Sequence, residues 1–360
     1  MNFIPYSKQV IEDDDIISFI DTLKSDFLTT GLKVNEFERK IYEISNAKYC
    51  VSVSNGTAAL HLAALALLSE GDRVLTTPNS FIATANSVLY AKATPIFVDI
   101  CDDGSIDLDL CEDMLKKDSS IKAIFAVSFS GKILNQDRLK YLKNTYGIKI
   151  LEDNAHTMGA KLTYSDISTF SFHPVKHITT GEGGAVVTND KALYEKIKML
   201  RNHGQDDKHQ MLDLGFNYRL SDISSTLGLS QIKKLYSFIE KRQSIAKRYD
   251  KAFQNTIVRP LYNFTETSLY HLYVVRIDFS KLDISKNDVM IKMREKGIGV
   301  QVHYKPINKQ PYYKSLGYGD EQTPVMNKYF QECLSIPCYP NLSEDEQDYV
   351  VNSLLEVLDA

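Results

Sequence analysis

Lys176 is the residue of this chain with the clearest potential for covalent chemistry. It lies in the segment SFHPVKHITTGEGGAVVT, between one predicted strand that ends near Phe172 and another that begins near Ala185. A loop lysine can form a Schiff base with a carbonyl group when burial or a neighbouring charge lowers its pKa. Most loop lysines are solvated surface charges instead. The residues that accompany Lys176 must decide between these interpretations.

Asp153 and His156 are the first of these companions. Asp153 ends the apolar run IKILED, at the carboxyl edge of a predicted sheet, where open α/β folds bind ligands. A carboxylate there can keep the pyridinium nitrogen of a cofactor protonated, so that the ring withdraws electrons from a carbon that loses its proton. The alternative is that Asp153 caps the following turn. His156 can lie beside the same ring, or it is a structural histidine.

A phosphate site is suggested by the segment VSVSNGTAALHLAALAL, which reads as a strand, a tight turn and a helix. Gly56 and Thr57 stand at the start of the predicted helix, where backbone amides suit a phosphate dianion. Ordinary helix capping explains the same residues equally well. Ser171 can add a hydroxyl group to the phosphate, or it is a plain strand serine. Phe81, predicted to open a helix, can stack on a pyridine ring or belong to the core.

The elements that position these residues follow an α/β pattern. Short β-branched and aromatic runs alternate with helical patterns between Tyr49 and Thr188; the strand candidates are YCVSVS, RVLTT, PIFVDI, IKAIFAV, IKILED, STFSF and AVVT. This rhythm predicts a mainly parallel seven-stranded sheet covered by helices.

A second, smaller domain is predicted after a long helix. The run from Ser221 to about Phe253 has no proline and keeps helical spacing, so we expect one helix that leaves the first domain. The domains are then 1–240 and 241–360. The smaller one has α+β composition, with a strand HLYVVRID, a helix KNDVMIKMREKG, a strand IGVQVH and a final helix from Ser343 to Leu358.

Composition excludes several classes of function. A net charge of −4 with no basic run argues against nucleic acid as a partner. The start of the chain lacks an export signal, and the most apolar stretch is shorter than the roughly 20 residues that cross a membrane. The 5 cysteines are widely spaced without a C-x-x-C pair, so no disulfide framework or zinc site is expected. These features favour a cytoplasmic protein that needs neither membrane nor metal.

Several long motifs resemble the DegT/DnrJ/EryC1/StrS family of pyridoxal phosphate (PLP) dependent sugar aminotransferases, which have the fold-type I architecture. The resemblance runs nearly end to end; its markers are LTTGLKVNEFE, SNGTAAL, TTPNSFIATANSVL, LEDNAHTMGA, FSFHPVKHITTGEGGAVVT, RNHG, GFNYRLSDISSTLGLSQI and VQVHYKPI. It implies that Lys176 forms the Schiff base and carries protons, that Asp153 holds the pyridine nitrogen, and that His156 lies against the ring or its 3-hydroxyl group.

The same resemblance implies the other site residues. Gly56, Thr57 and Ser171 are expected at the phosphate, and Phe81 is expected to stack on the cofactor. Asn217 matches an asparagine that reaches the cofactor phosphate of the neighbouring subunit, so a homodimer is expected. Arg219, in the same segment, is a candidate for the phosphates of a sugar nucleotide, against an equally good interpretation as an interface or surface salt bridge.

The motifs look most like members that transfer the amino group of L-glutamate to C4 of UDP-linked 4-keto-6-deoxy hexoses, in amino-sugar biosynthesis. Glu182, His303 and Tyr304 are then expected near the sugar, although a loop acid and a buried polar pair explain them as well. The alternatives are amination at C3 of a dTDP- or UDP-linked 3-keto sugar, and a non-catalytic sugar-nucleotide binding protein. A dehydratase is disfavoured because such members carry histidine where Lys176 stands, and a nicotinamide dehydrogenase because G-x-G-x-x-G is absent.

Two segments depart from the family pattern. After Gly159 the chain has only AKLTYSDI before the next strand, where relatives carry a longer hairpin. Phe129, in VSFSGKIL, stands where the family often has histidine. We therefore expect differences in the geometry of the site near the first segment and in contacts to the donor or sugar near the second.

Overall fold

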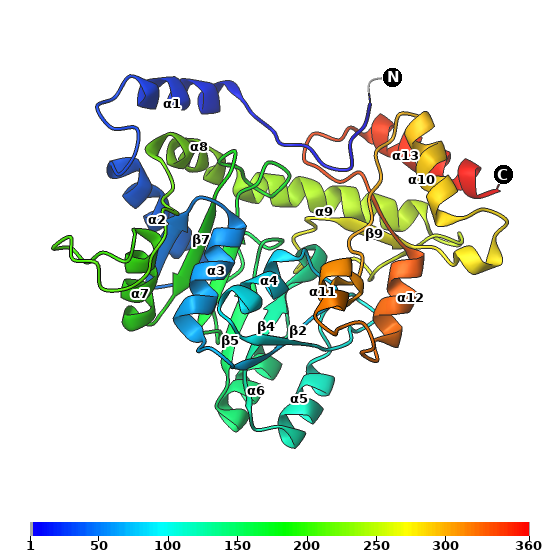
Figure 1. Ribbon diagram of the computed structural model, residues 1–360. Coiled ribbons are helices and arrows are strands. Elements are labelled where there is room, and N and C mark those ends of the chain that lie inside the picture. The colour runs from blue at the N-terminus through cyan, green and yellow to red at the C-terminus, as the bar shows by residue number, and fades with distance from the viewer. Residues whose placement is uncertain (1–2, 360) are drawn as a thin grey trace.

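A computed structural model describes residues 3–359 of the chain (Figure 1). The strands of its larger sheet are β1 Tyr49–Val53, β2 Arg73–Thr76, β3 Thr94–Phe97, β4 Ile121–Val127, β5 Lys149–Asp153, β6 Ile167–Ser171 and β7 Gly184–Thr188. Those of the smaller sheet are β8 Arg259–Pro260, β9 Tyr273–Arg276 and β10 Cys333–Ile336. The helices are α1 Asp13–Leu23, α2 Leu32–Ser45, α3 Gly56–Leu67, α4 Ala83–Tyr90, α5 Leu108–Lys117, α6 Gln136–Tyr146, α7 Lys191–Arg201, α8 Asp222–Ile232, α9 Leu235–Ala252, α10 Lys286–Glu295, α11 Pro311–Ser315, α12 Pro324–Glu332 and α13 Glu344–Asp359. None of the helices within residues 3–359 combines the length and the apolar character that a membrane crossing requires.

The predicted mainly parallel seven-stranded sheet is confirmed. Its order is β1-β7-β6-β5-β4-β2-β3, and only β7 runs antiparallel to its neighbours, which are β1 and β6. Strands β1, β6, β5 and β4 therefore point the same way, and their carboxyl ends share one edge of the sheet. This shared edge brings together residues that follow different strands.

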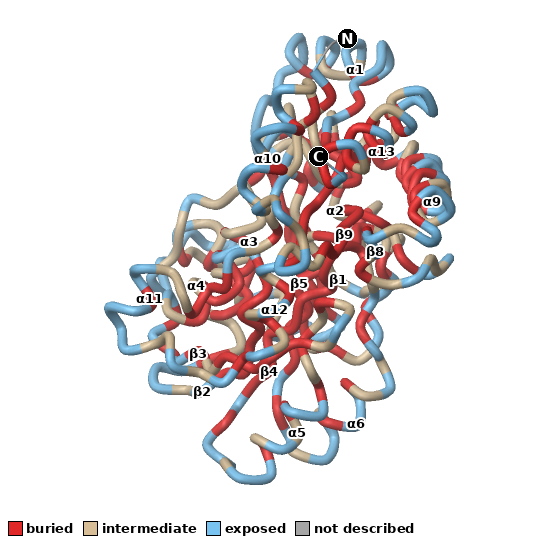
Figure 2. Tube along the Cα trace, turned by 90° about the vertical axis from the view of Figure 1, so that its right-hand side faces the viewer, coloured by how far each residue is buried: buried red, intermediate tan, exposed pale blue. Residues whose placement is uncertain are grey.

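Helices cover both faces of this sheet, and alternate strand residues pack against each layer. Leu151 and Val186 belong to the core beneath α3, α4 and α7, whereas Ile150 and Val187 face α2, α5, α6 and α9. Because both faces are covered, the strands read as continuous apolar runs. Figure 2 shows the result as buried segments in the middle of the molecule and exposed turns around them.

The single helix expected from Ser221 to Phe253 is wrong: α8 ends at Ile232, and α9 begins at Leu235. The break coincides with contacts to the start of α1. The ammonium group of Lys234 lies 2.5 Å from the Asp14 carboxylate and 2.9 Å from that of Asp15. A contact between segments more than 200 residues apart leaves no trace in local helical spacing.

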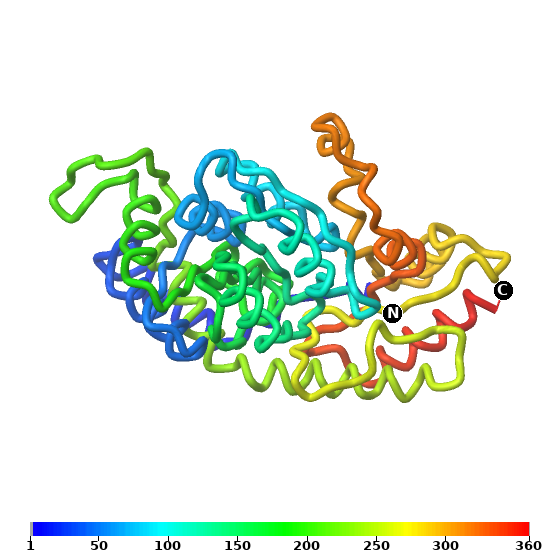
Figure 3. The backbone as a smooth tube through the Cα atoms, turned by 90° about the horizontal axis from the view of Figure 1, so that it is seen from below, coloured from blue at the N-terminus to red at the C-terminus, as the bar shows by residue number. Residues whose placement is uncertain are grey.

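Helix α9 links the two sheets. Its beginning packs in the core of the large sheet, through Leu235 and Ile239, and its end packs against the small sheet, through Ala246 and Tyr249. Figure 3 shows this long helix along one side of the molecule, continuing toward α13. The predicted domain boundary at residue 240 falls inside α9 and stays a prediction.

The C-terminal part differs from expectation in one element. The predicted strand HLYVVRID contains β9, and the predicted final helix is α13, but IGVQVH forms two isolated bridges instead of a strand, Ile298 with Ile4 and Gln301 with Ser335. The side chain of Gln301 accepts the N–H of Val302 at 3.0 Å, so this backbone group is satisfied without a ladder. Ile4, near the start of the chain, pairs with Ile298 and packs in the core of this C-terminal part.

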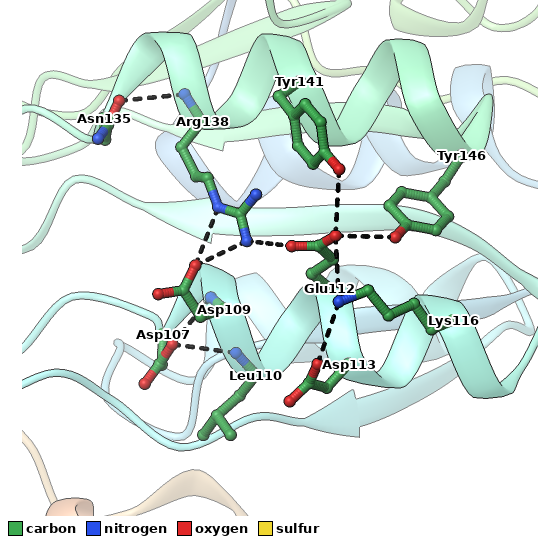
Figure 4. A network of polar contacts seen from close by, with 10 residues as sticks. All are labelled: Asp107, Asp109, Leu110, Glu112, Asp113, Lys116, Asn135, Arg138, Tyr141 and Tyr146. Carbon is green, nitrogen blue, oxygen red and sulfur yellow. Dashed lines mark hydrogen bonds and ion pairs between the residues drawn. The ribbon is translucent and has the colours of Figure 1, made fainter.

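A network of polar side chains joins α5 and α6, two of the helices that cover the large sheet (Figure 4). The carboxylate of Glu112 accepts hydrogen bonds from Arg138 and from the hydroxyl of Tyr146, which lies 3.0 Å away. Lys116 forms an ion pair with it at 3.2 Å. The hydrogen bond from Arg138 contributes most to lowering the pKa of Glu112 to about 2; desolvation opposes it, and the contacts to Tyr146 and Lys116 lower the pKa further. The ionised form of Glu112 thus stabilises the fold.

We expect Glu112→Gln to lower the midpoint of urea unfolding at pH 7, because the charged partner of Arg138 is lost. The folded pKa lies below the ordinary value of 4.5, so the stabilisation is present above pH 4.5 and fades as the pH falls toward about 2. The gap between wild type and variant should close over this range. Asp113→Asn, which removes only an exposed contact to Lys116, is the control. A gap that stays constant down to pH 2 contradicts the assignment.

Candidate active site

A cavity of about 810 Å³ opens at the shared carboxyl edge of the large sheet. Its wall combines residues that follow β1, β4, β5 and β6 with residues of the C-terminal part. Ten of the residues expected from the sequence line it, namely Gly56, Thr57, Phe81, Asp153, His156, Ser171, Lys176, Glu182, His303 and Tyr304. Pockets that join apolar walls to a few converging polar groups are the usual sites for small ligands.

Lys176 lies in the turn between β6 and β7, half-buried, with its side chain on the cavity wall. Burial lowers its pKa to about 8; the Asp153 charge acts in the opposite direction, and the Arg242 charge adds to the lowering. A substantial share of this amine is therefore neutral near physiological pH, which makes it a nucleophile and a proton acceptor. The surface-charge interpretation of this lysine does not hold.

Asp153 is buried at the end of β5 and is held by two donors. The hydroxyl of Thr84 donates to one carboxylate oxygen at 2.7 Å, and the N–H of Ala155 donates to the other at 3.1 Å. Burial raises the pKa of Asp153, whereas Thr84, Ala155 and the charge of Lys176 lower it. A cationic ring nitrogen in the cavity would offset the cost of burying this charge. Thr84, on α4, was missed by sequence reasoning because it looks like an ordinary helix residue.

The N-terminus of α3 forms a cradle beside Ser171. Asn55 caps the helix by accepting the N–H of Ala58 at 2.8 Å, while the amides of Gly56 and Thr57 belong to the first turn, which has no intrahelical acceptor. A Cβ atom at Gly56 would lie 2.9 Å from the Cβ of Ser171, so only glycine permits this approach. These amides, two hydroxyl groups and the helix dipole suit a phosphate.

The amine, the acid and the cradle match the aldehyde, ring nitrogen and phosphate of PLP. The acid stands at the end of β5, at Asp153, and the amine of Lys176 follows β6, which ends at Ser171. The cradle residue Gly56 follows β1, so one edge of the sheet presents the acid, the amine and the phosphate cradle. The residues present therefore fit this cofactor.

His156 and Tyr304 form a neutral pair on the cavity wall. The Nδ1 atom of His156 accepts the N–H of Ser130 at 3.3 Å, which leaves the ring proton on Nε2, 3.2 Å from the hydroxyl of Tyr304. Burial lowers the pKa of His156 well below its ordinary value, and the charge of Lys176 adds to this. Burial likewise raises the pKa of Tyr304. His303 contacts Ser335 at 2.8 Å, and burial lowers its pKa to about 3.

Phe81 and Glu182 are exposed residues of the cavity wall. Phe81 precedes α4, which begins at Ala83, so the expectation that it opens the helix is wrong by two residues. Its ring centroid lies 6.4 Å from that of Tyr304. Tyr6, Tyr218 and Gln301 also line the cavity. No local pattern marks Tyr6, which comes from the beginning of the chain.

Asn217 and Arg219 lie outside the cavity within this subunit. Asn217 is exposed and pairs with Asn202, and the guanidinium of Arg219 donates to the side chain of Asn202 at 2.6 Å. Arg219 lines a separate hollow of about 300 Å³ that also contains Asp206 and Asp207. The expected contacts of Asn217 and Arg219 to cofactor and substrate are therefore not made within one chain.

The two departures from the family pattern have different consequences. Phe129 is buried and packs its ring 5.9 Å from that of His156 and 6.1 Å from that of Tyr304, so it supports the back of the site. The short segment after Gly159 is anchored by the N–H of Leu162, which bonds Ser45 at 2.7 Å. Within the described part of the chain, residues 160–167 do not line the cavity.

Comparisons with known proteins agree with this geometry. Residues 9–355 match the model of the DegT/DnrJ/EryC1/StrS aminotransferase family. A Campylobacter jejuni protein, UDP-4-amino-4,6-dideoxy-N-acetyl-beta-L-altrosamine transaminase, is 39% identical over 99% of this chain and 98% of its own.

Two solved structures share the fold over nearly the whole chain. An aminotransferase of Helicobacter pylori involved in the biosynthesis of pseudoaminic acid superposes with a TM-score of 0.94 at 31% identity, covering 99% of this chain and 100% of its own. NtdA of Bacillus subtilis, with bound PMP, the aminated form of PLP, has a TM-score of 0.88 at 27% identity, covering 97% of this chain and 83% of its own. The chain belongs to the DegT/DnrJ/EryC1/StrS aminotransferase family, and pyridoxal phosphate is its cofactor.

Proposed function

We propose that this enzyme transfers the amino group of L-glutamate to C4 of a UDP-linked 4-keto-6-deoxy hexose and releases a UDP-4-amino-4,6-dideoxy sugar. The proposal rests on one observation above all. A lysine amine with a depressed pKa and a buried carboxylate face the same cavity, in a chain that is similar over its whole length to a transaminase named for such a sugar.

Lys176 is the proposed proton carrier of both half-reactions. When bound, PLP accepts the amino group of the donor and passes it to the acceptor, and its ring withdraws electrons from the carbon that loses a proton. The neutral amine of Lys176 takes the proton from Cα of the donor and delivers it to C4′ of the cofactor. With the keto sugar, the same amine moves a proton in the reverse sense. A pKa near 8 lets it accept and release protons at physiological pH.

The other residues of the cavity are proposed to bind and orient the cofactor. We propose that Asp153 keeps the ring nitrogen protonated, that Gly56, Thr57 and Ser171 bind the phosphate, and that Phe81 covers the ring. His156, which is neutral and whose two nitrogens contact Ser130 and Tyr304, lies against the ring without adding charge.

The sugar side of the proposal uses three other residues of the cavity wall. Glu182 is exposed on the wall, and Tyr304 and His303 come from the C-terminal part. Their hydroxyl, imidazole and carboxylate groups are suited to the hydroxyl groups of a hexose. Arg219 is the proposed contact to the nucleotide phosphates, supplied by a second subunit.

We further propose a homodimer that works in the reducing cytoplasm. Asn217 and Arg219 lie outside the cavity of their own subunit, so they complete a site only if another copy presents them. The 5 cysteines are free, as a reducing compartment would keep them.

We expect Lys176→Ala to lower turnover by about 100-fold or more, because the proton carrier is lost. Turnover is followed as 2-oxoglutarate formed from L-glutamate, and as amino sugar formed from a panel of UDP-linked 4-keto and UDP- or dTDP-linked 3-keto sugars. Lys176→Arg, which keeps the charge but cannot release its proton at neutral pH, should be equally impaired. Full turnover by Lys176→Ala contradicts the mechanism, and preference for a 3-keto sugar contradicts the proposed acceptor.

Asp153→Asn should slow the half-reaction with L-glutamate by about 100-fold, since the ring nitrogen loses its anionic partner. Glu152→Gln is a matched control: this buried acid is the adjacent residue of β5, and its side chain bonds Gln136 at 2.8 Å, away from the cavity. The measurement is the rate at which glutamate changes the visible spectrum of the enzyme. Equal rates for Asp153→Asn and Glu152→Gln would remove Asp153 from the mechanism.

The shared site is tested by mixing two inactive variants. Asn217→Asp places a carboxylate against the cofactor phosphate, and Lys176→Ala removes the amine. The mixture is unfolded and refolded, so that half of the dimers are hybrids of the two variants. If Asn217 acts in the partner's site, one of the two sites of each hybrid is intact, and about a quarter of wild-type turnover returns. If Asn217 acts in its own subunit, or not at all, the mixture gains no activity over the separate variants.

A further inference from the structure

His271 lies directly against the amine of Lys176, although no sequence motif marked it. It stands just before β9, in the C-terminal part, and its Nε2 atom is 3.5 Å from the Nζ atom of Lys176. Its ring centroid is 4.4 Å from that of His156. His271 is only 2% exposed and is not part of the cavity lining, so it contacts Lys176 from the protein interior.

The imidazole of His271 has a single polar partner among residues 3–359. Its Nδ1 atom is buried without a hydrogen bond, and its Nε2 atom contacts only the amine of Lys176. Unpaired buried polar atoms are costly, so the one contact that His271 does make, to the amine of Lys176, is the contact that holds its ring. The neighbouring His177 also has an unpaired Nδ1 atom, but its Nε2 atom bonds a backbone carbonyl, that of Leu269, at 2.8 Å, whereas the Nε2 atom of His271 contacts the side-chain amine of Lys176.

Arg242 fixes the distance between His271 and Lys176. This residue of α9 is fully buried, and its guanidinium donates to the carbonyl of His271 at 3.0 Å and to that of Cys338 at 2.6 Å. A longer contact of 3.5 Å reaches the carbonyl of Val175, which precedes Lys176. One rigid group thereby ties the backbone of the lysine turn to the backbone of His271.

We propose that His271 is a positioning residue that accepts a hydrogen bond from the amine of Lys176 whenever that amine is free. The contact uses one N–H bond of the tetrahedral nitrogen and so directs its single lone pair toward the cavity. It also stabilises the ammonium form once a proton has been taken up. The inference rests on the proposed role of Lys176 as proton carrier.

The charges around Lys176 leave a specific place for such an acceptor. The titratable and charged groups that face the amine are Asp153, Arg242, His156, His177, His271 and His303. Burial and the charge of Lys176 lower the pKa of His271 well below its ordinary value, so its ring is neutral and has a lone pair to offer. Asp153 is the one anion of this set, and His271 adds a second group that favours protonated Lys176.

The experiment measures the protonation of Lys176 without catalysis. The cofactor-free enzyme is labelled with trinitrobenzenesulfonate at a series of pH values, and the peptide with Lys176 is quantified by mass spectrometry. Wild type should give a pKa of about 8. His271→Phe should lower it by about one unit, because the acceptor is lost. His271→Gln, which keeps an acceptor, should restore the wild-type value, and His177→Phe, a matched change at a buried histidine without contact to the amine, should leave it unchanged.

A second readout uses the enzyme loaded with cofactor. His271→Phe should slow the half-reaction with L-glutamate at least about tenfold with an unchanged KM, and the isotope effect of Cα-deuterated glutamate should rise as proton transfer becomes limiting. His271→Met replaces the phenylalanine variant if that one does not fold. The same pKa in wild type and both apolar variants overturns the proposal, as does an equal shift in His177→Phe. Failure of the aminotransfer mechanism is detected separately, by activity of Lys176→Ala.

Discussion

Burial of the Lys176 amine beside the Asp153 carboxylate is the interaction on which the rest of the site depends. Burial alone would leave the lysine neutral and unable to hold a proton, and the Asp153 charge alone would leave it protonated. The balance requires both groups at one edge of one sheet. The parallel strands β5 and β6 provide that edge, and antiparallel β7 returns the chain after the lysine turn so that Gly184 lies against the start of α3.

Local patterns were sufficient for much of this arrangement. The strand runs predicted β1 to β7, and the motif SNGT predicted the start of α3, because both depend on residues close together in sequence. Lys176, Asp153 and Gly56 could be picked out for the same reason, and the structure places all three on the cavity wall. The break between α8 and α9 was not predictable, since its acidic partners come from α1. His271 stands 95 residues after Lys176 in a segment that reads as a plain strand, so only the fold reveals their contact.

Asn217 and Arg219 illustrate a different limit. Their motif was recognisable, but one folded chain places them beside Asn202 and not in the cavity. In the proposed homodimer their role requires a second copy, and the packing of a single subunit cannot locate such a role. The exposure of Asn217 is then informative: this residue lies on the surface, together with the large exposed side chains of Met211, Leu212 and Leu214 in the preceding loop. Such a surface is typical of an interface.

The position of Arg242 gives the C-terminal part a direct connection to the chemistry. A buried guanidinium without its hydrogen bonds would cost several kcal/mol, so the carbonyl groups that surround it must stay in place. Those carbonyls belong to the lysine turn, to His271 and to the segment after β10. Any shift of α9 relative to the small sheet therefore changes the surroundings of Lys176. The packing of the two sheets and the protonation of one amine are for this reason parts of the same constraint.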